Sequence, residues 1–146
     1  MDGKLVKIVN GSVAKQIALL NVENITCGTI ANEKICGRPL GLRRLNAQFL
    51  LVADAYHGLF KGCLILKLIF LVDKTLVDIE NNTVENIFSS NEEINGQTPL
   101  FINDVDLVNE SIAFVSDSSV RWQRRQFIYL VMENKGHILR IQSNKQ

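Results

Sequence analysis

The sequence has few of the residues that mark repetitive, metal-binding or disulfide-rich chains. Its 146 residues include only 2 Pro, 9 Gly, 3 Cys and 2 His. This composition excludes collagen-like and linker-like classes, and the absence of any CxxC pair argues against a structural zinc site. A formal net charge of +1 excludes a generally basic surface, so we expect no nucleic-acid partner. The 47% of hydrophobic residues instead predicts a folded domain.

A long hydrophobic run is also missing. The most apolar stretch, CLILKLIFLV at 63–72, contains a lysine and is shorter than the ~18–20 residues of a membrane span. The first residues, MDGK, are not followed by the apolar region of a signal peptide. We therefore expect any membrane association to depend on a segment that this chain lacks.

Two features nevertheless favour the secretory pathway, meaning the cell surface, an endomembrane lumen or the extracellular space. The first is a set of four N-x-[ST] sequons, which predict glycosylated surface loops. They start at Asn10, Asn24, Asn81 and Asn109. The second is Cys27 and Cys36, nine positions apart, because a disulfide closing that loop is permitted there. Composition alone slightly favours the alternative that these two residues and Cys63 are ordinary buried thiols.

Short runs of Val, Ile, Leu and Phe, bounded by Gly, Asn, Asp and Ser, predict an all-β fold. We expect strands over 5–8, 13–20, 49–55, 59–61, 64–72, 76–79, 84–88, 101–107, 112–116, 127–132 and 138–141. Residues 49–55 are echoed at 112–118, and such repetition is typical of β-propeller blades. On this evidence alone, a β-sandwich remains the alternative.

Several blocks resemble the strictosidine synthase-like family, in the branch of the adipocyte plasma membrane-associated proteins and hemomucins. They are CGRPLGLR at 36–43, VADAYHGLF at 52–60, FINDVD at 101–106, DSSVRWQRR at 117–125, and LVME with GHILR at 130–140. The resemblance implies a six-bladed β-propeller, of which about two to three blades are present. Residues 1–146 would then be an incomplete domain that begins in the first blade and stops in the third. The resemblance also implies a disulfide between Cys27 and Cys36.

One segment departs from the family pattern. The family continues from the GLF block directly into an alternating strand, whereas residues 62–76 intervene here before VDIEN at 77–81. This insert is explained either as an unspliced or misjoined gene segment or as a genuine hydrophobic hairpin that contacts a membrane or a partner.

The resemblance implies a site for Ca²⁺ within the FINDVD block. Related calcium-dependent propeller lactonases and paraoxonases use an Asn-Asp pair, which makes Asn103 the first candidate ligand and Asp104 the second. Calcium prefers about six to eight oxygen ligands, so this pair would supply part of a shell. The alternative is a polar turn. In the RWQRR stretch, we expect an arginine to pair with a carboxylate such as that of Asp117, and Trp122 to pack between blades.

The implied activity is that of an arylesterase-type hydrolase acting on a small ester or lactone. No catalytic residue can be assigned: His57 and His137 are both expected in turn or surface roles. True strictosidine synthase activity is not expected, because the family's catalytic glutamate would lie beyond Gln146. The alternatives are a non-catalytic, glycosylated surface binding protein of the hemomucin type and a non-functional fragment.

Overall fold

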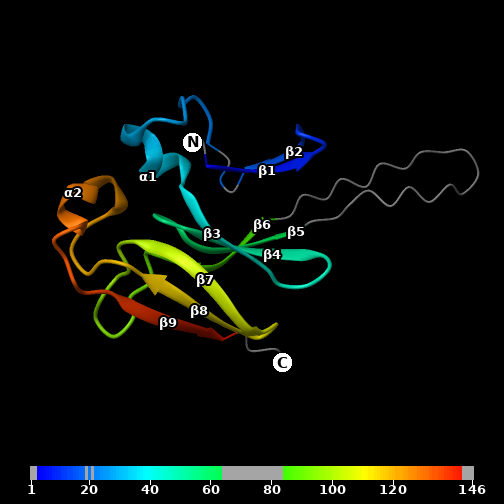
Figure 1. Cartoon of the computed structure of the whole chain (residues 1–146). Helices are drawn as coiled ribbons and strands as arrows, with labels where there is room; N and C mark the ends of the chain where they lie inside the picture. Colours follow the sequence, from blue (N-terminus) through cyan, green and yellow to red (C-terminus); the bar gives the residue numbers. More distant parts are fainter. Residues whose placement is uncertain (1–2, 19, 21, 64–83, 143–146) are drawn as a thin grey trace, which may run out of the picture.

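The computed structural model of this chain describes residues 3–18, 20, 22–63 and 84–142. These residues form nine strands with short helical turns between them (Figure 1). The strands are β1 (Lys4–Val9), β2 (Ser12–Ala18), β3 (Pro39–Arg44), β4 (Phe49–Asp54), β5 (Gly58–Cys63), β6 (Val84–Ser89), β7 (Ile102–Asn109), β8 (Ile112–Asp117) and β9 (His137–Gln142). The helical turns are η1 (Ile30–Asn32), α1 (Glu33–Cys36), η2 (Arg124–Gln126) and α2 (Phe127–Leu130).

Within each sheet, strands that follow one another along the chain are paired, and every pairing is antiparallel. The result is a hairpin of β1 and β2, a four-stranded sheet in the order β3-β4-β5-β6, and a three-stranded sheet in the order β7-β8-β9. Successive meanders of about four strands are the blades of a propeller. The predicted all-β class is confirmed, and the two larger sheets are consistent with a partial β-propeller.

The main core lies between the two larger sheets, because alternate residues of a strand face opposite sides. Leu51 and Ala53 of β4 belong to this core, whereas Val52 between them packs on the other face with Phe60 and, from the N-terminal segment, Leu5. The remaining buried members of the main core are Leu59, Phe88, Ile102, Val105, Ala113 and Val115.

Strands β3 and β7 approach each other closely where the two sheets meet. A Cβ built on Gly41 would lie 2.7 Å from the Cα of Asp104 and 2.9 Å from the nitrogen of Val105. Only glycine allows this approach without movement of one backbone. The contact places polar residues of β7 beside basic residues of β3.

Two expectations about the elements need correction. Residues 127–132, expected as a strand, form α2 and the turn after it, and Val131 and Met132 are 84% and 88% exposed. Strand β3 was not expected, because Pro39 and Gly41 are poor strand formers. The expected strands at 64–72 and 76–79, and nearly all of the 62–76 insert, lie outside the described residues.

Candidate functional site

The FINDVD block lies in β7, and its acidic side chains face Arg43 of β3. The Arg43 guanidinium lies 3.4 Å from the Asp104 carboxylate and 3.3 Å from that of Asp106. All three side chains are substantially exposed, and Asn103, which precedes Asp104 in the chain, is exposed as well. The register of β7 shifts between Ile102 and Val105. The block therefore forms a polar surface across the two sheets.

This surface does not fit the expected calcium ion by itself. Asn103 and Asp104 supply few of the oxygens that Ca²⁺ prefers, and Asp104 already lies beside a guanidinium, which repels a cation. Among the described residues, no group of three or more His, Cys, Asp or Glu side chains is arranged to hold a metal. The ligand role of Asn103 and Asp104 therefore stays a prediction.

Two aspartates occupy equivalent positions at the ends of β4 and β8. The buried Asp54 accepts hydrogen bonds through Oδ1 from the backbone nitrogens of Tyr56 (3.0 Å) and His57 (3.2 Å). The buried Asp117 accepts them from Phe101 (2.8 Å) and Leu100 (3.2 Å). Burial raises the pKa of both carboxyls, although these N–H donors oppose the rise. Each carboxylate fixes a connection at the same end of its sheet.

The second aspartate lies beside a histidine and a hollow. Nδ1 of His137 lies 3.9 Å from Oδ2 of Asp117, and the nearby His137 lowers the pKa that burial raises. Both residues line a hollow of about 420 Å³ between the loop before β7 and the start of β9. The sequence placed His137 before a strand, and the structure makes it the first residue of β9.

A buried glutamate, which the sequence analysis did not single out, joins the two larger sheets at this end. Glu33 of α1 accepts hydrogen bonds from Arg124 at 2.6 and 2.7 Å and from the hydroxyl of Tyr56 at 3.0 Å. The guanidinium of Arg38 lies 3.4 Å away. Burial and the bond to Glu33 raise the pKa of Tyr56 to about 12. α1 is therefore joined to η2, the helical turn that contains Arg124 and directly precedes α2 (Figure 1).

The RWQRR stretch is structural, as expected, but with different partners. Its ion-paired arginine is Arg124, and the carboxylate is that of Glu33 rather than that of Asp117. Trp122 stacks on Tyr129 within the same connection, with ring centroids 4.7 Å apart, and its packing between blades stays a prediction. Ser119 holds the start of this connection in place. Its hydroxyl donates a hydrogen bond to the Glu133 carboxylate and accepts one from the backbone nitrogen of Trp122 at 2.7 Å.

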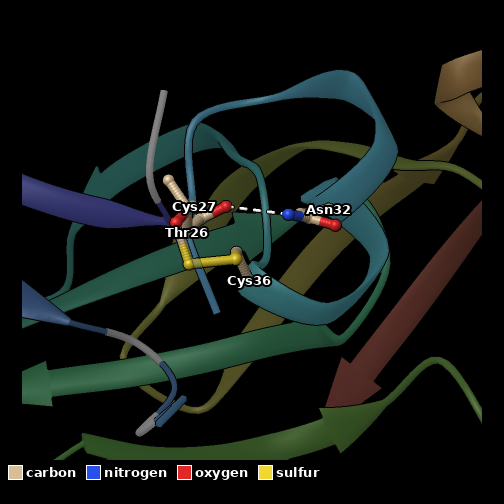
Figure 2. The surroundings of a disulfide bond; sticks show 4 residues. All are labelled: Thr26, Cys27, Asn32 and Cys36. Carbon is tan, nitrogen blue, oxygen red and sulfur yellow. Dashed lines mark hydrogen bonds between the residues drawn. A yellow bond between two sulfur atoms is a disulfide. The ribbon is translucent and has the colours of Figure 1, made fainter. Parts of the chain in front are cut away.

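The disulfide between Cys27 and Cys36 is confirmed (Figure 2). It joins the segment before η1 to the end of α1, and the Asn32 side chain braces the same loop by donating to the Thr26 carbonyl at 2.8 Å. Cys63 is a buried free thiol. Because only two residues separate Cys36 from the start of β3, the disulfide holds Glu33 near the end of that sheet.

The described sequon asparagines lie where glycosylation requires them. Asn10, Asn24 and Asn109 are all exposed, and the first two adopt positive φ in turns. Oδ1 of Asn109 accepts the backbone nitrogens of Ser111 and Ile112. Asn81 lies outside the described residues. Whether any of the four carries a glycan stays a prediction.

The consecutive antiparallel sheets and the disulfide define a disulfide-bonded, partial β-propeller. The comparisons with known proteins specify the family. The chain is 35% identical over 133 residues to the adipocyte plasma membrane-associated protein of Danio rerio and 34% to that of Homo sapiens. Protein strictosidine synthase-like 13 of Arabidopsis thaliana is 27% identical over 136 residues. The resemblance is confirmed: this chain is a homologue of the adipocyte plasma membrane-associated proteins.

These matches cover most of this chain but only a small part of each relative. They cover 90–91% of this chain but only 28–29% of the relatives. No family model matches the chain. No helix among the described residues has the length and hydrophobicity needed to cross a bilayer.

Proposed function

We propose that this chain forms part of a membrane-associated β-propeller of the secretory pathway that hydrolyses small esters or lactones, as an arylesterase does. The observation that carries the proposal is the 33–35% identity, over 90% of the chain, to adipocyte plasma membrane-associated proteins, together with the hydrolytic activity that this resemblance implies. The Cys27–Cys36 disulfide supports the compartment, because such bonds persist in oxidising surroundings.

The test is turnover of phenyl acetate by the 146-residue chain, followed through release of phenol. We expect hydrolysis that saturates with substrate and exceeds both the buffer rate and the rate with heat-unfolded chain. A rate equal to that of the unfolded chain would refute the proposal. Repeating the assay with a chelator separates a calcium-dependent reaction from a metal-independent one.

The predicted ligand Asn103 is tested in the same assay. If it binds a required cation in the functional protein, Asn103→Ala lowers turnover and added calcium partly restores it. Asn91→Ala changes another exposed asparagine and is the matched control. Equal activity of both variants, with and without a chelator, would remove the calcium prediction.

A second candidate is a glycosylated surface protein that binds partners without catalysis. It is favoured by the exposure of all three sequon asparagines that the structure describes, Asn10, Asn24 and Asn109. Mass spectrometry of the protein from its natural source, before and after treatment with peptide N-glycosidase, measures their occupancy. Occupied sequons on a protein without esterase activity would favour this candidate, and empty sequons would eliminate it.

A further inference from the structure

The hollow beside His137 is lined by both apolar and polar residues, and Asp117 and His137 are among them. Its apolar lining includes Ile94 and Leu100 from the loop before β7, and Val120 and Leu139 from the connection and strand that follow β8. Polar residues of the loop before β7 complete the lining, and polar groups in a small-molecule site fix the orientation of the ligand. The volume of about 420 Å³ suits a ligand of a few ring or chain atoms.

The polar groups are arranged as a carboxylate behind an imidazole. Asp117 is only 3% exposed, and its Oδ1 is already bonded to two backbone nitrogens. Its other oxygen faces Nδ1 of His137 at 3.9 Å, whereas the His137 side chain is 45% exposed. Nε2 lies across the ring from Nδ1, so it is directed away from Asp117. A carboxylate in this position orients the imidazole and favours the proton on Nδ1.

We propose that His137 is the general base, and Asp117 its positioning residue, in a site that hydrolyses a small uncharged ester bound in this hollow. The proposal rests on the hydrolase function proposed above. Neutral Nε2 takes a proton from water as the water oxygen bonds to the ester carbonyl carbon. The imidazolium then returns that proton to the alkoxide oxygen as the carbon–oxygen bond breaks, which leaves a carboxylic acid and an alcohol. The 3.9 Å separation shortens when substrate binds, as is common in catalytic pairs.

The preceding sheet contains the same pair in a closed form. Asp54 and His57 stand at the end of β4, but Oδ2 of Asp54 and Nε2 of His57 are buried and make no hydrogen bond among the described residues. Because Nε2 of His57 is inaccessible, a substrate cannot reach it. His57→Gln is therefore the matched control for His137→Gln.

The first experiment compares hydrolysis of phenyl acetate by the wild-type chain and the two variants, after circular dichroism has confirmed their folding. We expect His137→Gln to lose about a hundredfold in kcat, the usual size of a general-base contribution, and His57→Gln to stay within twofold. A folded His137→Gln variant with the wild-type rate would overturn the role of His137 and leave the hydrolase proposal intact. An inactive wild-type chain would instead refute the hydrolase proposal and the base role with it.

Asp117→Asn tests the positioning role, because asparagine keeps an oxygen that can accept the Leu100 and Phe101 nitrogens. We expect kcat to fall about tenfold with KM little changed. In ¹⁵N spectra, the His137 signals should shift toward the tautomer protonated at Nε2. A merely structural role would change stability and leave the tautomer of His137 unaltered.

A second measurement does not depend on any variant at position 137. The chain has only two histidines, so its imidazole NMR spectrum is simple, and His57→Gln assigns both sets of signals. Acetanilide, the hydrolysis-resistant amide counterpart of phenyl acetate, should shift the His137 signals saturably and leave those of His57 unchanged. If the His137 signals do not move, the hollow does not bind such a ligand and the proposal is wrong.

Discussion

Glu33 links α1 to the connection between β8 and β9, and Glu33→Gln should destabilise the fold by about 2–3 kcal/mol. Its side chain is only 4% exposed and accepts two short bonds from Arg124. Removing one partner of a buried ion pair typically costs about 3–5 kcal/mol, because a buried charge is left uncompensated. The Arg124 side chain is 26% exposed, so water partly solvates it and reduces the expected cost to about 2–3 kcal/mol.

The assay is urea unfolding followed by the fluorescence of Trp122, the single tryptophan, which stacks on Tyr129 in the connection that Glu33 holds. In a chain of this length, about 1 kcal/mol corresponds to roughly 2–4 °C in Tm. The Tm of Glu33→Gln should therefore be about 4–12 °C lower. A double-mutant cycle with Arg124→Gln should show a coupling energy of about 1–2 kcal/mol.

The matched control is the pair of Arg43 and Asp106, which is exposed and 3.3 Å apart. Surface pairs of this kind contribute about 0–1 kcal/mol, so Asp106→Asn should leave the urea midpoint nearly unchanged. Two results would contradict this role of the buried pair in joining the sheets. The first is that Glu33→Gln lowers the free energy of unfolding by no more than Asp106→Asn does. The second is that the effects of Glu33→Gln and Arg124→Gln are simply additive.

Three further predictions concern the disulfide, the contact between sheets and pH. Reducing the bond between Cys27 and Cys36, nine positions apart, should lower the free energy of unfolding by about 2.7 kcal/mol through loop entropy; an unchanged urea midpoint in dithiothreitol would contradict this. Gly41→Ala should lower the free energy of unfolding by about 1–3 kcal/mol, because the added Cβ would clash with β7. Gly62→Ala is the control, since a Cβ at Gly62 meets nothing within 4 Å. Equal Tm values for the two variants would disprove the clash. Burial raises the folded-state pKa of Asp54 above 3.8. The folded state therefore keeps this proton to higher pH than the unfolded state does. The free energy of unfolding should consequently fall as pH rises from 3.8 through the raised pKa. Asp54→Asn should flatten that part of the stability curve, and an unaltered slope would count against the burial argument.

The strands that the sequence predicted correctly share alternating or continuous apolar residues and a clear turn at each end. β4 and β8 are examples, and both end in a buried aspartate. β3 lacks this pattern of residues. It is held in place instead by contacts with other strands, namely its pairing with β4 and the close approach of β7 at Gly41. Residues 127–132 carry the apolar signal without being a strand. They follow η2, where Gln123 and Gln126 form a capping box, and their exposed side chains belong to no core.

The candidate site was less predictable, because its contacts join residues that are distant in the chain. Arg124 pairs with Glu33 across 91 positions, and Arg43 with Asp104 across 61. A sequence alone offers nearby partners, which is why Asp117 was expected to pair with an arginine. The Cys27–Cys36 disulfide was predictable because a family resemblance supplied the pairing that spacing alone left open.

The two aspartates show how connection length decides what a repeated motif can do. Both end the second strand of their sheet and lie beside a histidine, and burial raises the pKa of both. β4 and β5 are joined by residues 55–57 alone, so the turn folds back at once and encloses His57. Residues 118–136 join β8 to β9, and α2 and the Trp122–Tyr129 stack lie within this longer connection. His137 therefore enters at the start of β9 rather than inside a tight turn, where it borders an open hollow. On this argument, shortening the connection to the length of residues 55–57 would bury His137 and abolish both ligand binding and turnover, while Asp117 would still cap the end of its strand.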